Sequence, residues 1–403
     1  MTRANRLPAA LVAATVLVAA LVASCGLPGI GDGPGATTAS DPGPAGGASP
    51  SQATGGPVEA TAALPTPTPS PTPTPTPEPT PVMVPAPLTG RPVTPAEAAR
   101  HPVAVMVDDL RAARPQSGFT DASVVWHAPA EGGIPRYMLV FQESIPGDVG
   151  PVRSARPYYI AWASELNAVY VHVGGSPQAL AQLREFGNGQ QVYNADEFRY
   201  GGTYLWRVRT RSSPHNVYTD GEHLRELAGV VGARDGVIEW PWQFGPDLAP
   251  ALRPTGGSIE TSYPANTIRY TYDRRTNSYR RAVTGEKRQI DAATERPVAP
   301  RNVIVMRVSF GALADSAPSK GRLDARIIGE GEAWIATNGR AIHGTWRKAD
   351  LTAPTEFLDA DGKPVVLAVG QTFIQVIPRQ GALSVRNGKP AAPDAPAGGA
   401  IAD

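Results

Sequence analysis

Two arginines next to a predicted helix start are the clearest groups in the sequence for binding an anion. Arg153 and Arg156 lie three positions apart, beside the helix expected over residues 155–166. Guanidinium groups near the free N–H groups of a helix N-terminus attract phosphate or carboxylate. Ser154 could cap this helix or contact the same anion. The alternative is that the arginines form ion pairs within the domain, with candidates Asp108, Asp109 and Glu131.

Two glycine-containing turns supply further candidates for ligand binding. Gly174-Gly175-Ser176 follows an apolar strand and precedes a helix, so its backbone N–H groups could hold an oxyanion. Ordinary capping of that helix by Ser176 is the alternative. Glu131 and Arg136 flank the second turn, where two glycines permit a tight bend. We expect Arg136 to bind the ligand's charge unless it forms a structural pair with Glu131.

His215 and Glu131 are the candidates for acid–base catalysis. An imidazole titrates near neutral pH and can act as a general base, although a lone histidine often makes only a structural hydrogen bond. We expect Asn216 to contact the same ligand and Asp109 to orient the arginines. The sequence has no His-x-x-x-His spacing and a single cysteine, and its glycine turn lacks a nucleotide-binding fingerprint. It therefore predicts neither a metal site nor a cofactor.

An α+β fold with two domains is expected to position these residues. In residues 88–245, apolar runs of strand type alternate with helical patterns, which predicts a mixed α/β domain with a partly parallel sheet. Residues 246–257 form a predicted interdomain linker. Residues 258–380 alternate short strands with tight turns, which predicts a mostly antiparallel β domain. Within it, Asn338-Gly339 is typical of a type I′ hairpin turn.

The N-terminus has the pattern of a bacterial lipoprotein leader. Two arginines precede an apolar run that ends in small residues before Cys25, which predicts a signal peptide over residues 1–24 and acylation of Cys25, for example by palmitate. The alternative is an uncleaved signal anchor, because the run just reaches spanning length. Residues 25–87, rich in Pro, Thr and Gly, and residues 381–403 are predicted to be a disordered linker and tail.

Composition limits the partners of the chain. The 37 basic and 36 acidic residues give a net charge of +1, so the chain lacks the positive field that nucleic acid binding requires. The single cysteine rules out an intramolecular disulfide. The predicted partners are the extracytoplasmic face of the bacterial cell membrane, through the lipid anchor, and an anionic ligand of the cell envelope. The sequence does not identify protein partners.

A series of motifs resembles the YerB-type bacterial lipoprotein family, a two-domain family of unknown function. The matching stretches are residues 91–93, 102–106, 114–118, 131–133 with Arg136, 150–156, 174–178, 215–216, 344–348, 361–364 and 370–378. They cover about residues 88–380 and are specific in combination. Asp109 stands where the family pattern has Asn, Trp126-His127 where it has Tyr-Glu, and Phe373 where it has Trp. The resemblance implies an extracytoplasmic lipoprotein and no established activity.

Three functions are compatible with these features. The first is a tethered module that binds an anionic cell-envelope ligand, a phosphate or carboxylate. The second is an envelope hydrolase or transferase acting on phosphate- or sugar-containing polymers, in which arginines stabilise developing negative charge. The third is a scaffold that recruits proteins through aromatic residues of the β domain. Burial of Trp334 and Trp346 would remove the main support for the scaffold.

Overall fold

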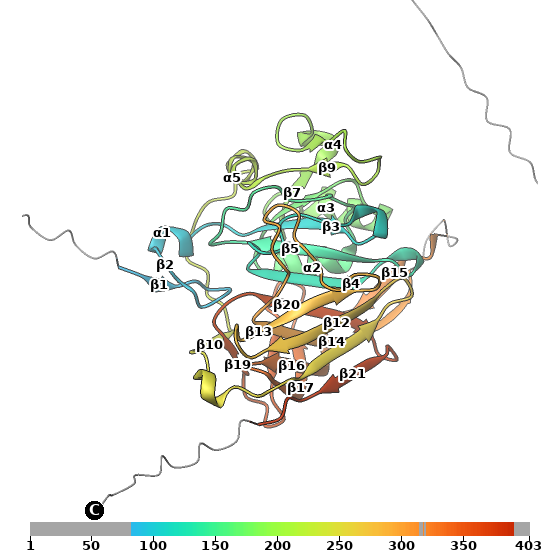
Figure 1. Ribbon diagram of the computed structural model, residues 1–403. Helices are drawn as coiled ribbons and strands as arrows, with labels where there is room; N and C mark the ends of the chain where they lie inside the picture. Colours follow the sequence, from blue (N-terminus) through green and yellow to red (C-terminus); the bar gives the residue numbers. More distant parts are fainter. Residues whose placement is uncertain (1–81, 314–316, 318–319, 391–403) are drawn as a thin grey trace, which may run out of the picture. The chain divides into compact units, whose positions relative to one another are not determined.

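The computed structural model of the chain describes residues 82–313, 317 and 320–390. The predicted signal peptide, Cys25, most of the predicted linker and the end of the predicted tail lie outside these residues. Within the described ranges, no helix is long and apolar enough to cross a membrane. The fold is α+β, with more strand than helix (Figure 1).

One mixed sheet of 11 strands includes strands from both halves of the chain. Its order is β18 (Glu356–Leu358), β17 (Arg340–Lys348), β16 (Gly329–Thr337), β14 (Asn302–Ala312), β20 (Thr372–Pro378), β4 (Val124–Pro129), β5 (Pro135–Phe141), β3 (Val103–Asp108), β6 (Val169–His172) and β7 (Tyr193–Asp196), and β15 (Leu323–Arg326) pairs with β14. The halves join where β20 pairs in parallel with β4, with Ile374 opposite Trp126. The predicted partly parallel sheet is thus confirmed, but it is shared between the predicted domains.

A second sheet is four-stranded and antiparallel, in the order β13 (Ser278–Val283), β12 (Thr267–Asp273), β11 (Ser258–Ser262) and β21 (Leu383–Arg386). Strand β21 lies in the segment predicted to be a disordered tail. Its alternating apolar side chains include Leu383, which packs on the core, so this prediction is wrong for residues 383–386. Likewise, β1 (Val84–Pro85) lies inside the predicted linker, where it pairs with β2 (Pro92–Val93) of the predicted N-terminal domain.

The side chains of β3 alternate between two hydrophobic cores, as a strand buried on both faces requires. Met106 packs in one core with Trp162 of helix α2 (Pro157–Ser164). Val105 packs in the other core with Tyr270 of the four-stranded sheet. This alternation decides on which side of the sheet each residue at the end of β3 lies.

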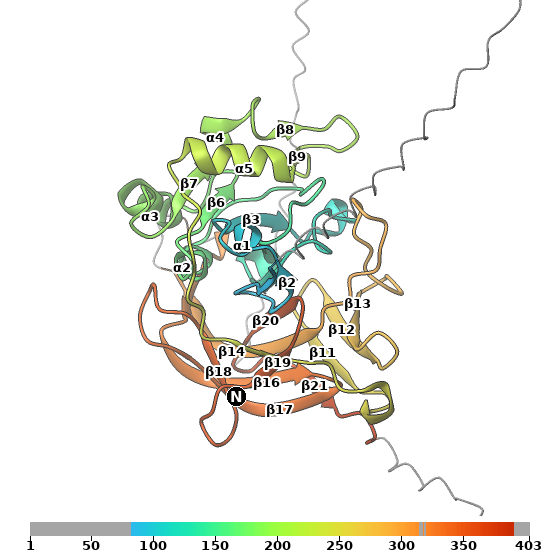
Figure 2. The same cartoon turned by 90° about the vertical axis from the view of Figure 1, so that its left-hand side faces the viewer.

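Within the described residues, five α-helices lie around the sheets. Besides α2 they are α1 (Pro95–Ala98), α3 (Pro177–Phe186), α4 (Glu197–Tyr200) and α5 (Gly221–Val230). Both ribbon views place α3, α4 and α5 at the end of the large sheet where β7 lies (Figures 1 and 2). The sequence predicts a capping box of Thr219 and Glu222 for the last helix, but Asp220 caps α5 instead. Thr219 is buried and donates its hydroxyl to the carbonyl of Tyr204.

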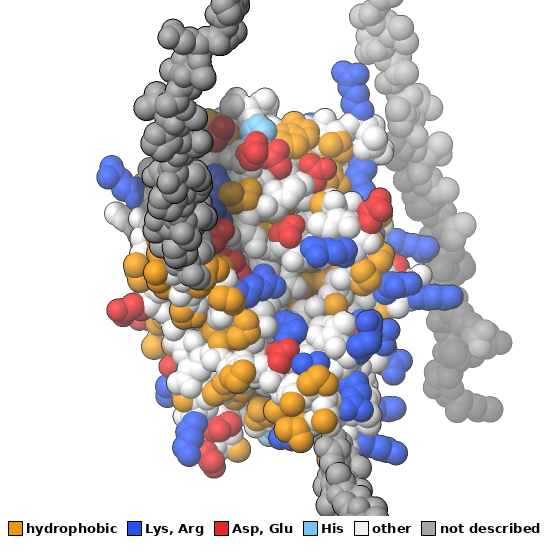
Figure 3. Space-filling model, turned by 60° about the vertical axis from the view of Figure 1, so that its left-hand side comes forward, with side chains coloured by type: hydrophobic (Ala, Val, Ile, Leu, Met, Phe, Trp, Pro, Cys, Tyr) orange, Lys and Arg blue, Asp and Glu red, His pale blue; other side chains and the backbone are white. Residues whose placement is uncertain are grey.

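The remaining elements are short. They are the 3₁₀ helices η1 (Arg111–Ala113), η2 (Glu131–Gly133) and η3 (Pro250–Leu252) and the strands β8 (Trp206–Arg207), β9 (Val217–Tyr218), β10 (Gln243–Gly245) and β19 (Val366–Ala368). The β16–β17 hairpin turns at Asn338 and Gly339, whose φ angles of 50° and 74° confirm the predicted I′-type turn. Figure 3 shows basic side chains interspersed with acidic and hydrophobic ones on one face of the molecule.

Candidate functional site

Three predicted arginines meet two carboxylates and a histidine near the ends of β3 and β5. We call Asp108, Glu131, Arg136, Arg153, Arg156 and His215 the arginine cluster. Asp108 ends β3, and its neighbour across the ladder is Arg136 of β5. Glu131 lies in η2, on the connection between β4 and β5. Arg153 is placed by a backbone hydrogen bond from its N–H to the carbonyl of Met106, and Arg156 precedes the first residue of α2.

Asp108 joins the first pair of basic groups. Its Oδ2 atom accepts hydrogen bonds from Arg153 Nε at 2.9 Å and from His215 Nδ1 at 2.7 Å. Its Oδ1 atom accepts the backbone N–H of Leu110 at 3.1 Å. The carboxylate is buried, so these contacts replace the water that it loses on folding. They also fix the positions of a guanidinium and an imidazole relative to each other.

Glu131 joins the second pair. It contacts Arg136 Nη2 at 3.3 Å through Oε1, and it accepts from Arg156 Nε at 2.6 Å through Oε2. Arg156 Nη2 also donates to Oε1, so this pair has the two-pronged geometry that guanidinium and carboxylate groups favour. Arg136 Nη1 donates to the carbonyl of Ser154 at 3.0 Å. All three arginines therefore form ion pairs within the domain, as the structural alternative in the sequence analysis proposed.

The cluster still carries an excess of positive charge. Its three guanidinium groups face two carboxylates, before any proton on His215 is counted. Burial lowers the pKa of Arg136, Arg153 and Arg156, because the charged form is less stable away from water. The side chain of Arg153 is 20% exposed and that of His215 is 15% exposed. These two groups are therefore the ones that solvent and a ligand can reach alongside Glu131.

The Gly174-Gly175-Ser176 turn makes structural contacts. Ser176 Oγ caps α3 by accepting the N–H of Ala179 at 3.2 Å, which is the structural alternative stated above. The N–H of Gly174 donates to Asp196 Oδ1 at 2.9 Å, and the N–H of Ser176 donates to the carbonyl of Ala155 at 3.3 Å. Two of the three N–H groups that were expected to hold an oxyanion are thus used within the protein.

Three other predicted residues lie away from the expected contacts. Ser154 does not cap α2, because the helix begins only at Pro157 and no side chain caps it. Asn216, expected to contact the ligand, accepts a hydrogen bond from Arg207 Nη1 at 3.2 Å through Oδ1. Asp109 does not orient the arginines of the cluster. Consecutive residues at the end of a strand point to opposite faces, so Asp109 lies on the other side of the sheet from Asp108.

Asp109 belongs to a second polar network, which is largely buried. Its Oδ2 atom contacts His127 Nε2 at 2.9 Å and Asn266 Nδ2 at 2.8 Å, and its Oδ1 atom contacts Arg114 Nη2 at 3.0 Å and Tyr137 Oη at 3.1 Å. Burial alone would raise the pKa of Asp109, but the hydrogen bond from His127 and the charges of nearby arginines lower it overall. Asp109 and His127, two of the residues that depart from the family pattern, therefore contact each other.

The network continues into the second half of the chain. His127 Nδ1 lies 2.8 Å from Gln375 Nε2 and 3.2 Å from Arg281 Nη2. Arg281 is completely buried, and its guanidinium lies over the rings of Tyr137 and Tyr270. The sequence does not identify Arg281 and Gln375 as members of this network. Arg281 follows the pattern of a polar residue in a strand, and its neighbours in sequence do not indicate its long-range partners. Among the described residues, no group of three or more His, Cys, Asp or Glu side chains could hold a metal ion.

Both halves of the chain match models of protein families of unknown function. Residues 88–234 match the DUF3048 N-terminal domain, and residues 259–374 match the DUF3048 C-terminal domain. YerB from Bacillus subtilis (strain 168), whose name describes it as a lipoprotein, is 31% identical over 308 residues, which cover 75% of this chain and 89% of YerB. A crystal structure of YerB protein from Bacillus subtilis superposes with a TM-score of 0.66 at 28% identity, covering 74% of this chain and 99% of that one. The chain therefore belongs to the DUF3048 family, the YerB-type family of two-domain proteins whose function is unknown.

Proposed function

We propose that this protein is a lipid-anchored, extracytoplasmic lipoprotein that binds an anionic cell-envelope ligand at the arginine cluster. Two observations support the anchor: the leader pattern ending at Cys25 and the lipoprotein name of the relative YerB. In this proposal, acyl chains such as palmitate on Cys25 hold the protein on the outer face of the cell membrane. The ligand is a phosphate or carboxylate of the envelope.

The observation that carries the ligand proposal is the state of Arg153. Asp108 holds its guanidinium at Nε, and the two terminal nitrogens make no hydrogen bond within the described part of the chain. The side chain is partly exposed, beside the equally accessible His215. A fixed guanidinium with free donors, in a cluster with excess positive charge, loses little entropy when it binds an anion. Arg136 and Arg156 supply the surrounding positive potential.

Thermal unfolding of the full-length chain in detergent tests this proposal. A panel of phosphate esters and carboxylates is added, and a ligand at about 100 times its Kd stabilises the folded state by about 2.7 kcal/mol. Arg153→Gln is expected to abolish the stabilisation. The matched control is Arg347→Gln, because Arg347 also contacts a carboxylate through Nε at 2.9 Å but lies exposed on β17. Equal stabilisation of the wild-type protein and Arg153→Gln contradicts the proposal.

The contact between His215 and Asp108 favours acid–base catalysis as a second candidate. Asp108 accepts from Nδ1, which leaves Nε2 as the basic nitrogen of a neutral ring. Arg153 lies on the same carboxylate oxygen, where it can stabilise negative charge on a substrate. We expect His215→Gln to lower any turnover of phosphodiesters or glycosides by about 100-fold or more. An unchanged rate in His215→Gln excludes this role.

The scaffold hypothesis receives less support from the positions of its aromatic residues. Trp346 is 2% exposed and donates its indole N–H to the carbonyl of Arg307. Trp334 is partly buried, packs against the core and donates to Glu332. Of the two residues, only Trp346 is fully part of the core, which weakens the main reason for proposing recruitment through them.

A further inference from the structure

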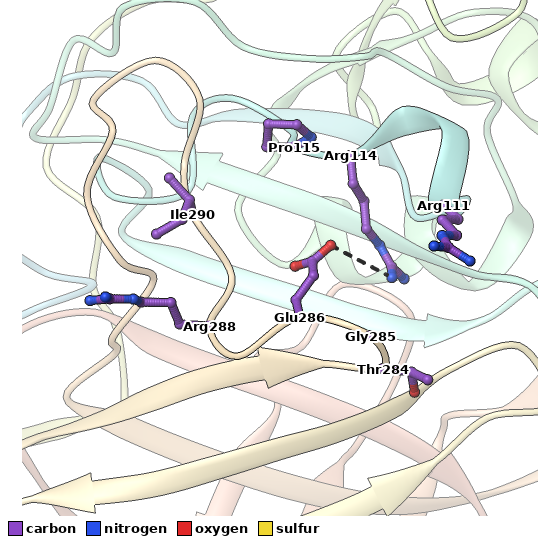
Figure 4. Close-up of a pocket in the computed structure, with 8 residues that line it drawn as sticks. All are labelled: Arg111, Arg114, Pro115, Thr284, Gly285, Glu286, Arg288 and Ile290. Carbon is purple, nitrogen blue, oxygen red and sulfur yellow. Dashed lines mark ion pairs between the residues drawn. The ribbon is translucent and has the colours of Figure 1, made fainter.

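A second basic region lines a cleft of about 400 Å³ on the other side of the β3 end from the arginine cluster. One wall comes from η1 and the residues after it, with Arg111 and Arg114. The opposite wall is the turn after β13, with Glu286 and Arg288. Figure 4 shows Arg114 and Glu286 pointing toward each other across the cleft, with Arg111 beside them. The volume falls within the range of small-molecule sites, about 300–1,000 Å³.

Arg114 is a rigidly held cation at the base of this cleft. Its side chain is only 6% exposed. Nε and Nη2 donate to Asp109 Oδ1 at 3.3 and 3.0 Å, and Nη2 also donates to the Asp109 carbonyl at 3.2 Å. These bonds occupy one edge of the guanidinium and leave Nη1 facing the cleft, 4.0 Å from Glu286 Oε1. Such a fixed donor is already oriented for an oxyanion.

Hydrogen bonds from Arg211 also hold the loop that carries Arg111 and Arg114. Arg211 donates to the carbonyls of Ala112 at 3.3 Å and Pro115 at 2.7 Å. The segment therefore does not depend on a ligand for its conformation. Arg211 also adds positive charge to this side of the molecule.

The charges of the cleft are not balanced by its own residues. Arg111 and Arg288 are exposed, and neither makes an ion pair within the described ranges. Three guanidinium groups thus meet two carboxylates, Glu286 in the cleft and Asp109 behind Arg114. Burial raises the pKa of Glu286, while Arg114 acts in the opposite direction. Glu286 is therefore a partly desolvated carboxylate that occupies the position of an anionic ligand.

We propose that this cleft binds the phosphoryl group of a small phosphate ester. Arg114 donates from the base, Arg111 and Arg288 close on the phosphoryl oxygens from the rim, and Glu286 turns away from Arg114 as the ligand enters. A doubly charged phosphoryl group matches the excess of guanidinium groups better than a single carboxylate does. Ile290 and Pro115 provide apolar surface for the organic part of the ester. The site is separate from the arginine cluster and does not depend on the proposed function.

Isothermal titration calorimetry of the full-length chain in detergent tests the proposal, with glycerol 1-phosphate as the probe, glycerol as the neutral control and succinate as the carboxylate control. We expect only the phosphate ester to bind. The double variant Arg111→Gln/Arg288→Gln is expected to weaken binding by at least 10-fold, and Glu286→Gln to strengthen it several-fold. Arg114 is left intact, because its loss would strand Asp109 in the buried network.

The variant Arg153→Gln separates this proposal from the proposed function. Any binding of glycerol 1-phosphate at the arginine cluster is lost in this variant, and we expect the binding event that Arg111→Gln/Arg288→Gln weakens to remain. Loss of binding in Arg153→Gln, with binding retained in the double variant, would assign the ester to the arginine cluster and overturn the cleft proposal. Absence of binding by the folded wild-type protein would overturn it as well. Succinate binding as tightly as the ester would overturn the assigned class of ligand.

Discussion

Replacing Lys348 with methionine should destabilise the protein strongly and in a pH-dependent way. Lys348 Nζ lies 2.9 Å from Glu165 Oε1, and the two side chains are 0% and 1% exposed. Glu165 also accepts the hydroxyl of Thr355 at 2.6 Å and its N–H at 3.0 Å. This pair links the end of α2 to β17 and to the segment before β18. Methionine fills the space of lysine but leaves the carboxylate without its counter-ion.

The size of the effect follows from the burial of the remaining charge. Removing one partner of a buried pair costs about 3–5 kcal/mol, because the other charge is left uncompensated. Burial raises the pKa of Glu165 even in the presence of Lys348, and loss of the lysine raises it further. A carboxyl with a higher pKa in the folded state takes up protons on folding. Its stabilising contribution is present below the unfolded pKa and is lost as pH rises through the folded pKa.

Urea unfolding followed by tryptophan fluorescence measures this effect. We expect Lys348→Met to lose about 3–5 kcal/mol at pH 7 and a smaller amount near pH 5, because the raised pKa of Glu165 favours its protonation as pH falls. The double variant Lys348→Met/Glu165→Gln removes both charges and keeps an acceptor for Thr355, so it should recover most of the loss. A deficit of less than about 1 kcal/mol, or one that is equal at both pH values, would refute the buried-charge argument.

Two further substitutions test local features of the fold. Gly339→Ala should destabilise the β16–β17 hairpin by about 1–3 kcal/mol, because φ is 74° there and a Cβ atom would clash with Tyr272 Cε1. An unchanged midpoint of urea unfolding would contradict this turn geometry. Ser176→Ala should lower the free energy of unfolding by about 1 kcal/mol, because α3 loses its N-cap. Ser176→Asn can still cap the helix and should lower it less. Equal losses in both variants would show that capping is not the cause.

Local patterns in the sequence predicted the elements that short-range chemistry determines. The apolar run beginning at Val103 forms β3, and Asn338-Gly339 forms the predicted hairpin turn. Ser176 caps α3 because its hydroxyl needs only an N–H group three residues ahead. Each of these features depends on neighbouring residues.

The pairing of distant segments could not be predicted in the same way. Asp108 and Asp109 read as equivalent in sequence, yet strand alternation places one with Arg153 and the other with His127. The partners of Asp109 include Asn266, 157 positions away in the chain. The sharing of one sheet by both halves likewise depends on the contact of β20 with β4, and neither strand carries a local signal for its partner. The departures from the family pattern at Asp109 and His127 were the available hint, because these two residues contact each other.

The central position of β20 has a consequence for the order in which the chain can complete its fold. This strand lies between β14 and β4 but is among the last to be synthesised. Until residues 372–378 have been made, β4 has one open edge, and the polar network around His127 lacks Gln375. An open apolar edge invites pairing with other chains. A product that stops short of residue 372 should therefore aggregate instead of leaving a functional N-terminal half, so the nascent protein is exposed to misassembly until β20 has been made.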